Sequence, residues 1–281
     1  LALGLTELIL RYQAISEGSE RRDHVERTDY LPVRFRPHYE GQFWGIPFTT
    51  NRYGFRDEPD FPPQRPPGEF RVLSLGDSIG FGLGVPADQH YTQVAERILA
   101  ADSPSPTVRV VNAGGQGYSP SGYFVYLNHE GIRLDPSFLV VEIELCNDIS
   151  DEAFLEWIDE DRDGRPERIE GGRYQLSWDG NLLGTYSTGW SLLDRSYLGT
   201  IAVRRALSLV ARFGDPRPVP ESAVLYSLGF DRILLTTERI ERGWENALGA
   251  IEGMYELARS NNIPFLLMVM PSRYLLSLIH I

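Results

Sequence analysis

Between residues 71 and 270, short apolar runs alternate with longer stretches in which apolar residues recur at helical spacing. The apolar runs, typical of buried strands, lie at residues 71–75, 108–112, 138–145 and 264–270. The helical patterns lie at about residues 91–100, 121–130 and 238–260, and Val94, Ile98 and Leu99 share one face of the first. Strands separated by helices form βαβ units, so this order predicts an α/β fold: a three-layer α/β/α sandwich with a parallel sheet.

Residues 151–236 interrupt the alternation and are predicted to form an insertion after the third strand. Residues 174–178 and 182–183 flank an Asp179-Gly180 pair, which predicts a β-hairpin. Loops beside a rigid scaffold tend to carry specificity, so we expect this insertion to decide which substrate is accepted. Its aromatic side chains suit either sugar rings or packing onto the domain: Trp157, Tyr174, Trp178, Tyr186, Trp190 and Tyr197.

The two ends of the chain differ from its middle. Residues 1–27 begin with an apolar run shorter than the ~20 residues that span a bilayer, and a polar, charged stretch follows. This pattern predicts the remnant of an N-terminal membrane anchor with its spacer, and hence an exported domain in the periplasm or at the cell surface; a core helix is the alternative. Residues 275–281 resemble a translated sequencing adapter, which predicts a non-native tail.

Residues 28–69 contain aromatics, prolines and glycines without clear periodicity, which predicts an extended N-terminal arm laid over the domain. Within the arm, residues 51–57 (NRYGFRD) indicate a tight turn, and residues 62–67 a stiff proline-rich linker. The main domain is then expected to occupy residues 70–274, with the insertion inside it.

Composition excludes several classes of partner and cofactor. A net charge of −12 leaves no basic surface to neutralise phosphates, so nucleic acid is not an expected partner. Cys146 is the only cysteine, which excludes an internal disulfide framework. Structural zinc sites need clustered cysteine and histidine, so no zinc and no other cofactor is expected.

Candidate chemistry begins directly after the first predicted strand, where the chain reads Gly76-Asp77-Ser78. A serine at this point lies at the carboxyl edge of a parallel sheet, where such folds bind ligands. One alternative is a simple turn, because all three residue types favour turns. Another is a phosphate-binding loop built on the glycines that follow, but the acid that dinucleotide sites place near the end of the second strand is missing after Asn112.

Three consecutive strand ends carry polar, turn-forming residues, and in a parallel sheet these ends lie side by side. Ser78 follows the first strand, Gly117 the second and Asn147 the third. Covalent hydrolysis of an ester requires a nucleophile and several donors aimed at the developing oxyanion. A serine hydroxyl, a glycine N–H that a substrate can approach closely and a side-chain amide are suitable groups.

These motifs resemble the blocks of the SGNH (GDSL-type) esterase and lipase family. VLSLGDSIGFGLGV resembles the first block, VVNAGGQGYSP the second and the CND of ELCND the third, and NRYGFRD resembles a lead-in of membrane-anchored members. The resemblance covers roughly residues 51–274 and implies a flavodoxin-like α/β/α fold. It also implies that Ser78 is the nucleophile, and that Gly117 and Asn147 complete the oxyanion hole with the Ser78 N–H.

The sequence departs from the family pattern in two places. Leu145 stands where the third block usually begins with glycine, which affects the local backbone path. The family also supplies its general base as the histidine of a D-x-x-H block near the C-terminus. No histidine lies three residues after an aspartate among His24, His38, His90, His129 and His280. We expect the Asp and His of this block to have been encoded beyond residue 281, which leaves Ser78 without its base.

The resemblance implies a serine esterase that hydrolyses an acyl ester, with an acetyl group on a surface carbohydrate as the preferred substrate class. Two alternatives stay open. An O-acyltransferase would use the same residues with a sugar hydroxyl as acceptor, and a non-catalytic carbohydrate-binding or scaffold protein would keep only the fold.

A second motif lies in the insertion. Residues 159–170 fit D-x-D-x-D-G-x₅-E, the twelve-residue calcium loop, with carboxylates at Asp159, Asp161, Asp163 and Glu170. Pro166 occupies a position that usually holds a branched apolar residue, and a strand rather than a helix is predicted to follow. We therefore expect an acidic, solvated loop that does not bind calcium tightly.

Overall fold

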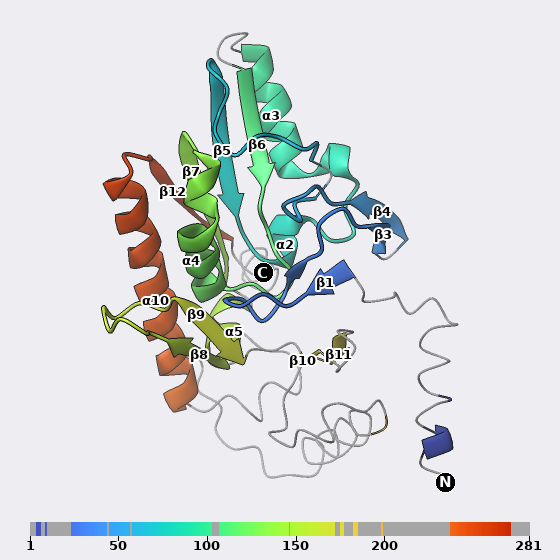
Figure 1. Cartoon of the computed structure of the whole chain (residues 1–281), viewed down its shortest axis with the longest axis vertical. Helices are drawn as coiled ribbons and strands as arrows, with labels where there is room; N and C mark the ends of the chain where they lie inside the picture. The colour runs from blue at the N-terminus through green and yellow to red at the C-terminus, as the bar shows by residue number, and fades with distance from the viewer. Residues whose placement is uncertain are drawn as a thin grey trace, which may run out of the picture.

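A four-stranded parallel sheet forms the centre of the protein (Figure 1). The order across the sheet is β12-β7-β5-β6. The strands are β5 (Glu69–Leu75), β6 (Thr107–Asn112), β7 (Phe138–Glu144) and β12 (Phe265–Met270). The computed structural model describes residues 4–6, 9, 24–43, 45–56, 58–102, 107–145, 147–171, 175–176, 182–184, 198 and 237–270. The chain therefore starts the sheet at β5, adds β6 on one side and then β7 and β12 on the other.

Helices lie beside the sheet as the alternating pattern predicts. The long ones are α3 (Tyr91–Asp102), α4 (Pro120–His129) and α10 (Thr237–Ser260). Helices α4 and α10 pack against each other, and α3 packs against β6 (Figure 1). Short helices at the strand connections are α2 (Ser78–Phe81), η2 (Ala87–Gln89), η3 (Gly131–Leu134) and α5 (Asp148–Glu152). The predicted α/β fold with a parallel sheet is confirmed.

The main core lies where the sheet meets α4 and α10. Leu73, Leu139 and Met254 are fully buried members of one apolar cluster from these elements. Ile98 and Leu99 of α3, which helical spacing groups with Val94, are instead 57% and 42% exposed. They belong to the C-terminal part of α3. In β6, against which α3 packs, the first residue is exposed and the next two are only half-buried.

The N-terminal arm folds as two small antiparallel units: β1 (Val25–Glu26) with β2 (Arg34–Phe35), and β3 (Glu40–Phe43) with β4 (Ile46–Thr49). Val25 is fully buried, and Val25 and Glu26, which were expected to belong to the spacer of residues 1–27, pair with β2 of the arm. The sequence does not reveal that Val25 is buried, because it is a single apolar residue among polar neighbours. Most of residues 1–23 lie outside the described part of the chain. Within that part, no helix is long and apolar enough to cross a membrane.

The predicted turn after β4 forms, and it is built around one side chain. Asn51 Oδ1 accepts hydrogen bonds from the N–H groups of Tyr53 (2.9 Å) and Phe55 (3.1 Å). Gly54 has a φ of 79°, which favours glycine. A β-bridge between Thr50 and Arg56 closes the turn.

The start of the insertion contains two antiparallel hairpins: β8 (Leu155–Ile158) with β9 (Arg168–Gly171), and β10 (Gln175–Leu176) with β11 (Leu182–Gly184). The second is the hairpin predicted around Asp179-Gly180, although these two turn residues lie outside the described residues. The β8–β9 hairpin was not predicted, because each strand has only four residues and the loop between them is long and acidic. Much of residues 185–236 is also outside the described part.

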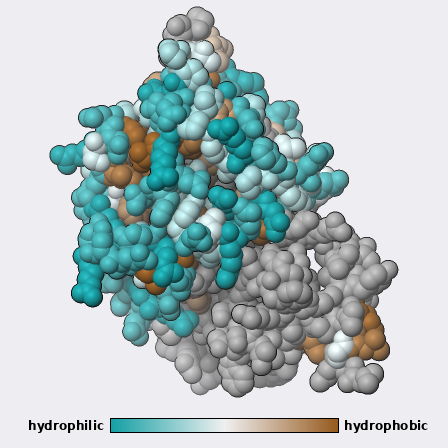
Figure 2. Space-filling model, viewed as in Figure 1, coloured by the Kyte–Doolittle hydropathy of each residue, from teal (hydrophilic) through white to brown (hydrophobic). Residues whose placement is uncertain are grey.

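The described surface is mostly hydrophilic, as the net charge of −12 leads one to expect (Figure 2). Hydrophobic areas appear on the side where β12 and α10 lie in Figure 1. On the edge strand β12, Leu266 and Val269 are 49% and 51% exposed.

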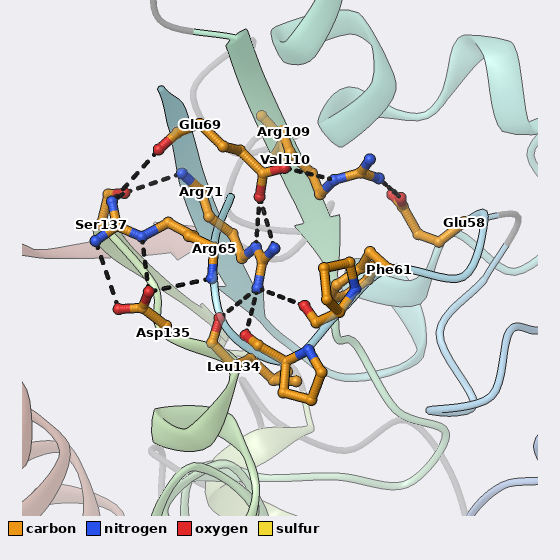
Figure 3. Close-up of polar contacts among 12 residues, drawn as sticks. Glu58, Phe61, Arg65, Glu69, Arg71, Arg109, Val110, Leu134, Asp135 and Ser137 are labelled. Atoms are coloured by element: carbon orange, nitrogen blue, oxygen red, sulfur yellow. Dashed lines mark hydrogen bonds and ion pairs between the residues drawn. The ribbon is translucent and has the colours of Figure 1, made fainter. Parts of the chain in front are cut away.

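At the amino end of the sheet, a fully buried arginine ties the arm to the domain (Figure 3). The Arg71 Nε donates to Glu69 Oε1 (2.7 Å). Its Nη1 donates to the carbonyls of Pro62 (3.2 Å), Pro63 (2.7 Å) and Leu134 (2.6 Å). These contacts join the proline-rich linker, β5 and η3, so the linker is fixed to the sheet.

Candidate active site

The first loop of the site places Ser78 at the start of a one-turn helix. Strand β5 ends at Leu75, and Asp77 caps α2 by accepting hydrogen bonds on Oδ1 from the N–H groups of Ile79 (2.7 Å) and Gly80 (3.3 Å). Ser78 is half-buried, and no hydrogen bond involves its hydroxyl among the residues that the structure describes. Ser78 therefore lies half-buried at the carboxyl edge of the sheet, directly after β5.

The second loop packs directly against the first. The Gly115 N–H donates to the Gly76 carbonyl (2.9 Å), and the Asn112 amide donates to the Phe81 carbonyl (3.3 Å). A Cβ on Gly114 would lie 2.4 Å from the Phe81 nitrogen, so only glycine allows this approach. Gly117 follows in the same loop, half-buried and with a φ of 73°.

The third loop brings Asn147 to the first. The Asn147 Nδ2 donates to Asp77 Oδ2 (2.9 Å), one residue before Ser78, and lies 3.5 Å from Asp151 Oδ2. The Glu144 N–H donates to Asp148 Oδ2 (2.9 Å), which fixes the turn at the end of β7. The three strand ends thus meet as the sequence indicates, and both donor directions of the Asn147 amide face carboxylates in this structure.

Buried carboxyl groups lie beneath these loops. The exposed fractions of Asp77, Glu142 and Asp148 are 2%, 1% and 0%. Burial raises the pKa of Asp77, and it raises the pKa of Asp148 well above its usual range. Burial also raises the pKa of Glu142 to about 7.

Glu142 supports the backbone of the loop that carries Ser78. Its Oε2 accepts a hydrogen bond from the Tyr91 hydroxyl (2.9 Å). A Cβ added to Gly76 or Gly80 would lie 3.0 or 2.8 Å from this same oxygen. Glycine at these two positions therefore lets the loop rest on a buried carboxyl group. Glu142 Oε1 has no hydrogen-bond partner among the described residues.

Glu142 is expected to make the stability of the protein depend on pH. Its pKa of about 7 lies above the ordinary value of 4.5, so between these values the folded protein binds more protons than the unfolded chain. The free energy of unfolding should therefore fall as the pH rises through this window, by about 3 kcal/mol in total for this group. Urea unfolding at pH 5 and pH 8 should show that Glu142→Gln loses this part of the decrease.

Glu152 also has a pKa raised by burial to about 7, and its contribution to the decrease should persist in Glu142→Gln. The matched control is Glu156→Gln, which changes an exposed glutamate on β8 and should keep the full decrease. The same decrease in Glu142→Gln as in the unmodified protein would contradict the prediction.

The described histidines make contacts away from Ser78. The Nε2 of His24 pairs with Gln116 Oε1 (2.7 Å), and that of His129 with the Glu167 carbonyl (2.6 Å). His90 Nδ1 pairs with Thr92 Oγ1 (2.8 Å). None of the hydrogen bonds within the described part of the chain joins a histidine to Ser78. His280 lies outside that part.

The acidic loop of the insertion gathers a different set of carboxylates from the one predicted. Ligand atoms of Asp159, Asp161, Asp163 and Glu167 lie within 4.8 Å of one another. Glu170 lies on β9, opposite Glu156, and forms an ion pair with Arg168. The strand begins at Arg168, before the twelfth loop position, and therefore removes Glu170 from the cluster. The absence of tight calcium binding stays a prediction.

Comparisons with known proteins give structural likenesses only. No family model matches the chain, and no curated protein matches it. One similar solved structure is an SGNH-hydrolase family esterase, with 23% identity over 28% of this chain and 42% of that one, and a TM-score of 0.24. Another is a lipase/acylhydrolase from Enterococcus faecalis, with 16% identity, coverage of 70% and 74%, and a TM-score of 0.27.

A third similar structure is a gut microbial diltiazem-metabolizing enzyme, with 15% identity, coverage of 73% and 38%, and a TM-score of 0.25. The match spans less than half the length of the first and third of these proteins. TM-scores this low give no support to a shared function, so the fold assignment rests on the strand order and parallel pairing described above.

Proposed function

We propose that the protein is a serine esterase of the SGNH (GDSL) type that acts through an acyl-enzyme on Ser78. The observation that carries the proposal is the meeting of three strand-end loops beside a serine whose hydroxyl has no hydrogen-bond partner among the described residues. In the reaction, Ser78 Oγ would bond to the ester carbonyl carbon, its proton would pass to a base, and the carbon–oxygen bond to the alcohol would break. Water would then release the acid from Ser78.

The oxyanion donors would be the N–H groups of Ser78 and Gly117 and the Asn147 amide. The Ser78 N–H belongs to the first turn of α2, where helix N–H groups lack intrahelical partners. To reach an oxyanion, the Asn147 amide would have to turn one hydrogen away from Asp151, its more distant partner. Its bond to Asp77 would then hold the side chain in place.

The substrate class within this proposal is an acetyl ester on a carbohydrate, acted on by an exported, membrane-anchored protein. Selection among esters is assigned to the insertion. Trp157 packs the insertion onto the domain, because its Nε1 donates to Ser121 Oγ (2.7 Å) and its ring lies against Gly249 of α10. The other proposed sugar-binding tryptophans, Trp178 and Trp190, lie outside the described residues.

The proposal predicts that an aryl acetate acetylates Ser78 and that the acetyl group accumulates there. No described histidine hydrogen bonds to Ser78, so we expect turnover by the 281-residue chain to be slow, and the trapped intermediate to be easier to detect than the released acid. Mass spectrometry of the intact protein and of its peptides, after incubation with the aryl acetate and imidazole as an external base, should locate the group.

A heat-unfolded sample of the same chain is the control, because it keeps the serine hydroxyl and loses the donors. Equal acetylation of Ser78 in folded and unfolded samples, or acetylation only elsewhere, would overturn the esterase proposal. Rapid steady turnover without imidazole would show that a base is already present.

A further inference from the structure

The helix that carries Ser78 is too short to be stable by itself. Helix α2 has four residues, and isolated helices shorter than about 12–15 residues are marginal in water. The last carbonyl groups of any helix also lack intrahelical partners. Asp77 supplies side-chain hydrogen bonds at the amino end. What holds the carboxyl end therefore helps to fix the position of Ser78.

Arg56, from the turn of the N-terminal arm, holds that carboxyl end. Its side chain is buried, and its Nη1 donates to the carbonyls of Phe81 (3.2 Å) and Gly82. Its Nη2 donates to the carbonyl of Val85. Gly82 closes the helix with a φ of 80°, and a Cβ there would lie 2.9 Å from the Arg56 Nη1. A buried guanidinium thus binds three carbonyl groups, those of Phe81, Gly82 and Val85, at and just after the end of α2, where the helix dipole also favours positive charge.

Aromatic side chains of the arm reinforce the same contact. Phe35 stacks on Phe81 with ring centroids 3.8 Å apart, and the Phe48 ring meets Phe81 edge-on at 5.7 Å. His24, at the start of the arm, hydrogen bonds to Gln116, which precedes Gly117 in the second loop. The arm therefore contacts both the nucleophile loop and the loop that carries a proposed oxyanion donor.

We propose that Arg56 is a positioning residue for Ser78, which it holds in place through the carboxyl end of α2. This inference rests on the proposed function only for its catalytic consequence. The turn around Asn51 and the β-bridge between Thr50 and Arg56 fix the backbone position of Arg56. The role of the NRYGFRD motif would then be to direct the Arg56 side chain to α2. A displacement of a reacting atom by about 1 Å can cost about 10²-fold in rate.

The test compares Arg56→Lys with Arg52→Lys. Lysine keeps the charge at position 56 but lacks the planar fork that reaches several carbonyls. Arg52 lies in the same turn, is exposed and contacts Tyr53, so its substitution should change little. In Arg56→Lys, the maximum rate of Ser78 acetylation should fall by roughly 10- to 100-fold, while the ester concentration at half-maximal rate stays unchanged.

Hydrogen exchange provides a readout that does not depend on catalysis. The N–H groups of Phe81 and Gly82, which donate to Asp77 and Ile79 carbonyls, should exchange faster in Arg56→Lys, while those of β5 keep their protection. Should the unmodified protein show no acetylation of Ser78, the esterase proposal fails, and the exchange data alone decide on Arg56.

Equal acetylation rates and equal exchange in Arg56→Lys and the unmodified protein would overturn the positioning role. Should Arg56→Lys not fold, Arg56→Gln takes its place, because its amide is neutral and too short to bind all three carbonyl groups that Arg56 binds. It should show the same fall in rate and the same local exchange. Unchanged values in Arg56→Gln would overturn the proposal in that case.

Discussion

Replacing Asn147 with alanine is expected to slow the acetylation of Ser78 by about 10²–10³-fold, the usual effect of removing one oxyanion donor. The physical reason is that the amide beside Asp77 is the one side-chain donor in the proposed hole. Ser78→Ala should abolish the acetyl-enzyme completely and defines the background. The measurement is the initial rate of acetylation by an aryl acetate, followed by mass spectrometry with the same concentration of imidazole in every sample.

Asn147 also hydrogen bonds to Asp77, so its removal needs a control that disturbs the same turn without removing the donor. Ser150→Ala provides one, because the Ser150 hydroxyl donates to the Asn147 carbonyl (2.9 Å) and takes no part in the proposed hole. Its acetylation rate should stay within a few-fold of the unmodified protein. A rate for Asn147→Ala as high as that for Ser150→Ala would exclude the oxyanion role.

The strands of the sheet and its three long helices could be predicted because their apolar residues repeat at a fixed period. The sequence also predicted that the three site loops lie together, because the carboxyl ends of parallel strands meet at the same edge of a sheet. Helix α2 could not be found this way, because one turn is too short for any period to appear. Its stability comes from Arg56 and Phe35, whose contacts with it span more than twenty residues of sequence.

Two further features could not be predicted, because they depend on contacts between residues that are distant in the sequence or on strand pairing. Glu142 is visible in the sequence only as a charge within an apolar strand, and its place beneath Gly76 and Gly80 depends on the packing of two neighbouring strands. Residues 159–170 have the spacing of a calcium loop, but that motif requires all twelve residues to form one loop. Pairing of β8 with β9 begins at Arg168 and substitutes Glu167 for Glu170 in the carboxylate cluster.

Replacing Arg71 with methionine is expected to lower the free energy of unfolding by about 3–5 kcal/mol, the range for breaking a buried ion pair by removing one partner. Arg71 is fully buried over the Phe61 ring, with its guanidinium carbon 4.7 Å from the ring centroid (Figure 3). Methionine keeps much of the apolar stem, but it leaves the Glu69 carboxylate, whose side chain is 9% exposed, and three backbone carbonyls without this donor. Urea unfolding should show the loss as a lower midpoint with an unchanged slope.

Arg109→Met is the matched control for this loss. Arg109 also lies over Phe61, but its side chain is 25% exposed and its ion pairs with Glu58 (3.5 Å) and Glu69 (3.6 Å) are longer than that of Arg71, so its loss should cost clearly less. Arg71 lies near the start of β5, whereas Ser78 follows the end of this strand. Folded Arg71→Met should therefore acetylate Ser78 at the rate of the unmodified protein. Equal stability of the two variants would refute the assigned role of Arg71, and slower acetylation in folded Arg71→Met would show that the linker contacts also affect the site.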